Sequence, residues 1–164
     1  MSLWLLDRCK WNSWPFVQEK FSTIPCHANL NDIIRRSFIR AAIPAIKEPP
    51  GLFRADGKRP DGVTQIPWQF GKCLPWYVTV TDTLALSYVH LSAISAGNAS
   101  ENAASKKVSK YEQILTNFDF SPLAFETMGP INSSGLAVIE QLGRKLAAVS
   151  GDRREGSFLF NAFR

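Results

Sequence analysis

The sequence has no apolar run long enough to cross a lipid bilayer, because a membrane helix needs about 20 consecutive apolar residues. Its apolar start, residues 1–6, is followed at once by Asp7, Arg8 and Lys10, so the long apolar core of a signal peptide is missing. These two absences predict a protein with no membrane segment that stays inside the cell, in the nucleus or the cytoplasm.

Cysteine and histidine are scarce. The three cysteines, Cys9, Cys26 and Cys73, are an odd number and form no C-x-x-C pair, which argues against a disulfide framework. The two histidines, His27 and His90, are far apart, and no four residues have the spacing of a zinc site. We therefore expect a domain that folds without disulfides or zinc in a reducing compartment.

What the sequence does have is an excess of positive charge. It contains 19 lysines and arginines against 14 acidic residues, a net charge of +5 over 164 residues. Such an excess favours polyanionic partners, because each phosphate contact releases condensed counterions; a solvated basic surface is the alternative that composition leaves open. The residues that we expect to contact nucleic acid are Arg35, Arg36, Arg40, Lys58, Arg59, Lys72 and Lys106.

The hydrophobic pattern predicts helices that alternate with strands. We expect a helix over 29–42 with Asn29 as its N-cap, and a second helix that Ser134 caps and Gly151 ends. The other expected elements are strands at 43–48, 60–66, 74–81 and 123–128, a helix at 100–115, turns at 55–58 and 70–72, and the first turns of a helix at 157–164. This order predicts an α/β (α+β) fold, a mixed central sheet of about four strands flanked by helices.

One group of residues suggests phosphodiester chemistry. Asp61 follows Pro60 at a strand start, and Gly62 lets a ligand or another backbone come close. A carboxylate in such a position suits a hard cation such as Mg²⁺, which polarises a phosphate and activates water. An aspartate in a Pro-Asp-Gly turn is the alternative that this segment alone leaves open.

A second carboxylate for the cation would have to come from the neighbouring strand. By the period of two, Tyr77 and Thr79 share one face of that strand while Val78 and Asp82 share the other. Position 77 is therefore the natural place for it, and a phenol is a poor Mg²⁺ ligand.

A lysine to stabilise the developing charge comes from the helix that follows. Lys107, Lys110 and Tyr111 are three and four residues apart, so they share one patch of that helix. Lys107 also lies on the apolar stripe, so we expect it to point inward. A solvated basic face is the alternative for these lysines.

From His27 to Phe160 the chain resembles the restriction-enzyme-like endonuclease domain, of PD-(D/E)XK type, of non-LTR retrotransposon polyproteins. The segments that carry the resemblance are His27-Ala28 with Leu30-Asn31-Asp32-Ile33-Ile34, Glu48-Pro49, Gly57-Lys58-Arg59-Pro60-Asp61-Gly62, Ile66-Pro67-Trp68, Val78-Thr79-Val80, Lys107 with Lys110-Tyr111, Glu126-Thr127-Met128-Gly129-Pro130 and Ser150-Gly151-Asp152-Arg153-Arg154-Glu155. Residues 1–26 form an unmatched N-terminal arm, and residues 27–164 an endonuclease-like domain that we expect to be truncated at its C-terminus.

The resemblance implies a Mg²⁺-dependent domain that nicks target DNA for target-primed reverse transcription. It implies that Asp61 is a metal ligand and catalytic residue and that Lys107 or Lys110 is the catalytic lysine. Family members have aspartate where this chain has Tyr77, so we expect weak cleavage or none. The reverse transcriptase and zinc knuckle that precede the domain in the family are absent from this chain. The alternatives are a non-catalytic nucleic-acid-binding module and a decayed reading frame with no selected function.

Overall fold

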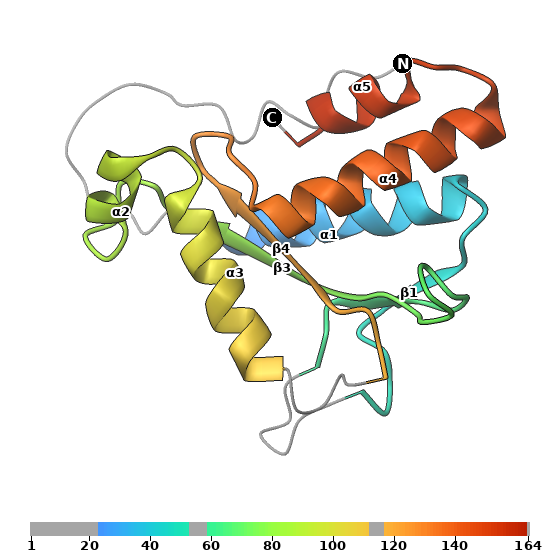
Figure 1. Ribbon diagram of the computed structural model, residues 1–164, viewed down its shortest axis with the longest axis horizontal. Coiled ribbons are helices and arrows are strands. Elements are labelled where there is room, and N and C mark those ends of the chain that lie inside the picture. Colours follow the sequence, from blue (N-terminus) through green and yellow to red (C-terminus); the bar gives the residue numbers. More distant parts are fainter. Residues whose placement is uncertain (1–22, 53–58, 112–116, 164) are drawn as a thin grey trace.

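The computed structural model describes residues 23–52, 59–111 and 117–163, with side chains from Cys26 onward. Four strands form a single sheet, and helices lie on both of its faces (Figure 1). The elements in chain order are α1 (Thr23–Arg40), β1 (Ala45–Lys47), β2 (Gly62–Thr64), β3 (Pro75–Thr81), α2 (Val89–Ile94), α3 (Asn98–Tyr111), β4 (Ser121–Glu126), α4 (Ser133–Ser150) and α5 (Glu155–Asn161).

The sheet is mixed, and its strands follow the order β1-β2-β3-β4. β1, β2 and β3 form an antiparallel meander, whereas β4 runs parallel to β3 after the crossover through α2 and α3. The β2–β3 ladder is short, with only Gly62 opposite Trp76 and Val63 opposite Pro75. The expected class, a mixed sheet of about four strands flanked by helices, is therefore confirmed.

The larger core lies between the sheet and the helices α1 and α4. Trp76 of β3 is fully buried, and its ring stacks on Phe38 of α1 with 5.1 Å between the centroids. Trp68, from the loop between β2 and β3, meets the same Phe38 ring edge-on at 5.3 Å. Two buried tryptophans, one from β3 and one from the loop before it, thus pack on the same ring of α1 and fix the helix on this face.

The opposite face of the sheet carries α3. Its buried residues Ala103 and Ala104 contact Ala124 of β4, so only small side chains separate helix and strand here. Because Ala124 alternates with the core residues Leu123 and Phe125, β4 is buried on both faces. The helix therefore lies close to the strands.

Two helix starts differ from the sequence-based expectation. α1 begins at Thr23, so Asn29 lies within the helix and not at its cap. Pro25 did not prevent the earlier start, because a proline is tolerated in the first turn, where its missing N–H has no intrahelical partner. α4 starts after Asn132, not after Ser134. The Asn132 side chain accepts the Ala124 N–H and donates to the Pro122 carbonyl, which ties the start of α4 to β4.

The end of α4 agrees with the expectation, since Gly151 adopts the left-handed conformation at φ 75°. The next segment forms α5, which packs on α4 where Gly143 and Gly156 leave room for close approach. Phe163 is buried and stacks on Phe125. Phe158 of α5, by contrast, is 57% exposed.

Within the described ranges, no helix combines the length and the apolar character needed to cross a membrane. The expected turn at 55–58 and the expected helical residues 112–115 lie outside those ranges.

Candidate active site

Asp61 lies directly before β2, and three hydrogen bonds fix its backbone. Its N–H donates to the Trp76 carbonyl at 3.0 Å, and its carbonyl accepts the Glu48 N–H at 3.0 Å. The same carbonyl accepts the Asn31 side-chain amide of α1 at 3.2 Å. The Pro-Asp-Gly segment is thus held between β1, β3 and α1, which gives its side chain one defined position.

The Asp61 carboxylate is used inside the protein. Its Oδ2 atom accepts the Val78 N–H at 2.6 Å and faces His27 Nε2 at 3.0 Å. The β2–β3 ladder ends at the pair of Gly62 and Trp76. The Val78 N–H of β3 therefore has no partner on β2. The carboxylate satisfies this N–H in place of a backbone carbonyl, as buried and half-buried amides require.

His27 is the residue of this site that the sequence analysis missed. It is 34 residues away from Asp61, and only the packing of α1 brings the two together. One signal was available: His27 and Asn31 are four residues apart and therefore share one face of a helix. Both side chains contact Asp61, one at the carboxylate and the other at the backbone.

The His27–Asp61 contact changes the proton affinity of the imidazole. The hydrogen bond to Asp61 is the main cause that raises the pKa of His27 above its usual value of 6.5. Partial burial opposes this increase, and so does the positive charge of Lys107.

Gly62 is needed here for packing, and not for the approach of a ligand or backbone that we expected. A Cβ atom at this position would overlap the indole ring of Trp76. That ring also donates its Nε1–H to Asn31 at 2.8 Å. The glycine of the Pro-Asp-Gly segment therefore makes room for the largest side chain of the core.

Tyr77 and Lys107 form the other half of the site. Lys107 Nζ lies 3.7 Å from the centroid of the Tyr77 ring, the geometry of a cation–π contact. The Tyr77 ring also packs on Tyr111 of α3, with 5.5 Å between the centroids. Asp61 accepts the N–H of the residue that follows Tyr77, and Lys107 lies over the Tyr77 ring, so each of the two contacts β3 beside or at position 77.

The donors at this site do not fit the Mg²⁺ ion that the resemblance implies. Mg²⁺ needs several oxygen ligands in octahedral geometry, but Asp61 Oδ2 already accepts hydrogen bonds and position 77 offers no carboxylate. The Lys107 ammonium lies over the ring there, where it repels a cation. Across residues 23–52, 59–111 and 117–163, no three His, Cys, Asp or Glu side chains are grouped in a way that holds a metal.

Of the two predicted catalytic lysines, Lys107 is the one whose contact with the Tyr77 ring is described above. Lys110 lies three residues further along α3 and is half-buried. The side chain of Lys106, on an adjacent part of the helix, lies over the ring of Tyr88 at 5.4 Å from its centroid.

The predicted nucleic-acid-binding residues lie on different surfaces. Arg35, Arg36 and Arg40 belong to α1, on one face of the sheet, whereas Lys106 belongs to α3, on the other. Lys72 is exposed in the loop between β2 and β3, and Lys58 lies outside the described residues. The members of this set that belong to α1 and α3 therefore lie on opposite faces of the sheet (Figure 1).

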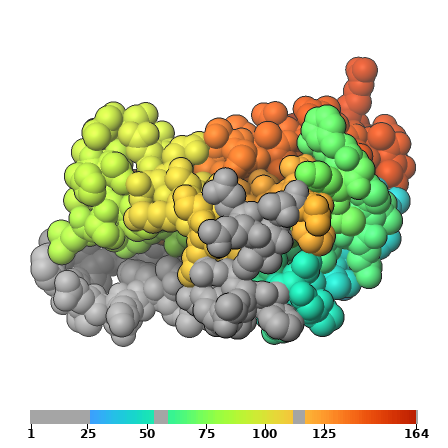
Figure 2. All heavy atoms as spheres, turned by 60° about the horizontal axis from the view of Figure 1, so that its bottom comes forward, coloured from blue at the N-terminus to red at the C-terminus, as the bar shows by residue number. Residues whose placement is uncertain are grey.

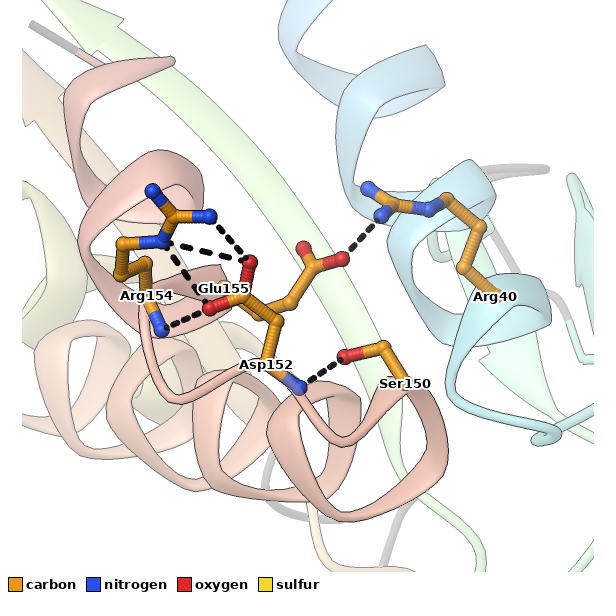
Figure 3. Close-up of polar contacts among 5 residues, drawn as sticks. All are labelled: Arg40, Ser150, Asp152, Arg154 and Glu155. Atoms are coloured by element: carbon orange, nitrogen blue, oxygen red, sulfur yellow. Dashed lines mark hydrogen bonds and ion pairs between the residues drawn. The ribbon is translucent and has the colours of Figure 1, made fainter.

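Two of these arginines make ion pairs within the protein. Arg40 donates to Glu155 of α5 at 2.7 Å, beside the corner that Ser150, Asp152 and Arg154 form (Figure 3). Arg59 pairs with Glu48. These pairs neutralise part of the positive charge on which the prediction of nucleic-acid contacts depended.

No model of a known protein family matches the chain, and neither a curated protein nor a solved structure matches it.

Proposed function

We propose that this chain is an endonuclease-like, DNA-binding domain of retroelement type that has lost efficient cleavage. The resemblance of its motifs supports the ancestry, and the mixed sheet with helices on both faces is the architecture that the resemblance implies. The clustering of Asp61, position 77 and Lys107 supports the location of the former catalytic centre.

The observation that carries the proposal is the state of these three residues. The Asp61 carboxylate bonds to His27 and to the Val78 N–H, and the Lys107 ammonium lies on the Tyr77 ring. Hydrolysis of the ancestral kind needs a cation between two carboxylates and a lysine directed at the phosphate. Here one carboxylate is replaced, the other is engaged, and the lysine contacts an aromatic ring. The centre thus contributes to the fold and not to cleavage.

Nicking of supercoiled plasmid in Mg²⁺ or Mn²⁺ tests the proposal. We expect the native chain to nick no faster than Asp61→Ala, because neither has a pair of carboxylates. Tyr77→Asp restores the second carboxylate and removes the ring under Lys107, so we expect it to nick faster than the native chain. The double variant Tyr77→Asp/Asp61→Ala is the control, and it should return to the native level.

Robust nicking by the native chain that Asp61→Ala abolishes would refute the loss of cleavage. Circular dichroism of each variant shows whether it is folded, since Tyr77 packs on Tyr111 and Asp61 bonds to β3.

A further inference from the structure

The loop between β2 and β3 ends in a tight turn, residues Gln69–Lys72, which we name the hairpin tip. The Lys72 N–H donates to the Gln69 carbonyl at 2.7 Å, and the Trp68 N–H donates to the Lys72 carbonyl at 2.7 Å. The two central residues, Phe70 and Gly71, have positive φ angles of 49° and 72°. This pattern is a type I′ turn, whose first central position strongly favours Asn, Asp or Gly.

Phe70 is an unusual residue for that position. Its side chain is 94% exposed, so its ring contributes almost nothing to the core. Its backbone is in the left-handed region, which a side chain with Cβ enters only at a cost. Folding therefore gains neither from the ring nor from the backbone conformation. Strain of this kind at an exposed position points to a role in binding.

The hairpin tip is held rigidly on the body of the protein. Trp68 is buried against Phe38, and Lys145 Nζ of α4 lies 5.2 Å from the centroid of the Trp68 ring. The side-chain amide of Gln69 donates to Gln141 of α4. Figure 2 shows green atoms of this hairpin at the surface on the right of the view, beside the orange atoms of α4. The two residues before Phe70 are thus anchored to α1 and α4.

Three cations, Lys72, Arg144 and Lys145, lie at or beside the tip, against two acidic residues, Glu140 and Asp119, whose N–H donates to the Cys73 carbonyl at 3.0 Å. The segment from Gln65 to Cys73 contains Lys72 and no acidic residue. Arg144 and Lys145 follow Gln141 by three and four residues, so they lie on the face of α4 that the tip contacts. Glu140 is the only acidic residue in the sequence of α4. An exposed ring among cations favours a partner that has both phosphates and flat aromatic groups.

We infer that Phe70 is a base-stacking residue and that the hairpin tip binds single-stranded or gapped DNA. The choice of nucleic acid rests on the proposed DNA-binding function. An unpaired base can stack its π-face on the ring without first being unstacked from a duplex, and the identity of the base matters little. Lys72, Arg144 and Lys145 contact the neighbouring phosphates, which makes the affinity depend on salt.

Fluorescence anisotropy with two labelled DNAs of equal length, an intact duplex and a duplex with a short single-stranded gap, tests this inference. The variant Phe70→Asn removes the ring and suits the turn better, so its fold is retained. We expect it to bind gapped DNA roughly tenfold more weakly than the native chain, with an unchanged dependence on salt because no charge is lost. Phe70→Trp should retain the affinity.

Phe158→Asn is the matched control, because Phe158 is also exposed but belongs to α5. We expect it to bind like the native chain. Equal affinity of Phe70→Asn and the native chain for gapped DNA overturns the inference, and would leave a protein surface as the partner for this ring. No binding of either DNA by the native chain overturns it as well.

The two proposals fail in distinguishable ways. A native chain that binds gapped DNA through Phe70 and also nicks plasmid refutes the loss of cleavage alone. A native chain that binds gapped DNA equally well with and without the Phe70 ring refutes the base-stacking role alone. A native chain that binds neither DNA refutes the base-stacking role together with the DNA-binding part of the proposed function.

Discussion

The two ends of the β2–β3 hairpin are built in opposite ways. At one end, the Asp61 carboxylate is hydrogen-bonded to the His27 ring and to the Val78 N–H inside the protein. At the other end, Phe70 directs its ring into solvent from a strained backbone. In Figure 1, the tip of this hairpin lies at the right end of the sheet and α2 at the left.

The difference shows how to distinguish side chains that stabilise the fold from side chains that are available to bind another molecule. Asp61 has the residue type of a catalytic acid, but its hydrogen bonds satisfy the protein's own donors. Phe70 has no reactive group, yet neither packing nor backbone preference explains it. Residue type alone ranks Asp61 above Phe70 as a candidate for binding, whereas their contacts and backbone conformations favour the opposite order.

The largest effect on stability is expected at the Asp61 end. Asp61→Ala leaves the Val78 N–H and His27 without their acceptor, so we expect the free energy of unfolding to fall by about 2 kcal/mol. Urea denaturation measures it. Asp82→Ala is the control, because the Asp82 side chain is exposed and accepts the Leu84 N–H at the surface, so we expect less than about 0.5 kcal/mol. Equal losses for the two variants would contradict a structural role of Asp61.

The hairpin tip should respond in the opposite direction. Phe70→Asn places a residue that tolerates positive φ at the first central position of the turn and loses almost no buried surface. We expect the free energy of unfolding to rise by about 1 kcal/mol, again by urea denaturation. A decrease would mean that the ring supports the fold, and the contrast between the two ends would then disappear.

The smallest effect is a pH dependence at the Asp61 end. Because its contact with Asp61 raises the pKa of His27, the stability gained from protonated His27 is fully present below pH 6.5. It is lost as the pH rises through the higher pKa of the folded state. His27 is more than a third exposed, so we expect less than about 1 kcal/mol in total.

Thermal melting between pH 5.5 and 8.5 measures this dependence, and His27→Gln should remove it. His90→Gln is the control, because His90 is the other histidine of the chain and is exposed. A native chain whose pH profile matches that of His27→Gln would show that the His27–Asp61 contact adds no stability.

Much of the fold follows from local sequence patterns. The apolar stripes of the helices, the alternation in β3, Gly151 at the end of α4 and the turn around Gly71 each depend on neighbouring residues alone. Periodicity also placed Lys107 on the inward side of α3, where the structure has it over Tyr77. Helix starts were less predictable, because both Asn29 and Ser134 suit a cap but contacts further away decide which residue becomes one.

The sequence by itself determined the order of the elements apart from α2, the placement of Asp61 at the start of a strand and of Lys107 on a helix, and the lack of a carboxylate at position 77. Only the tertiary structure decided that His27 bonds to Asp61, that Trp76 fills the space beside Gly62, and that a rigid support holds the Phe70 ring in solvent. The physical reason is range. Hydrogen bonds between neighbours and the periods of helix and strand depend on residues close together in the sequence. Contacts between residues tens of positions apart form only when whole elements pack against one another.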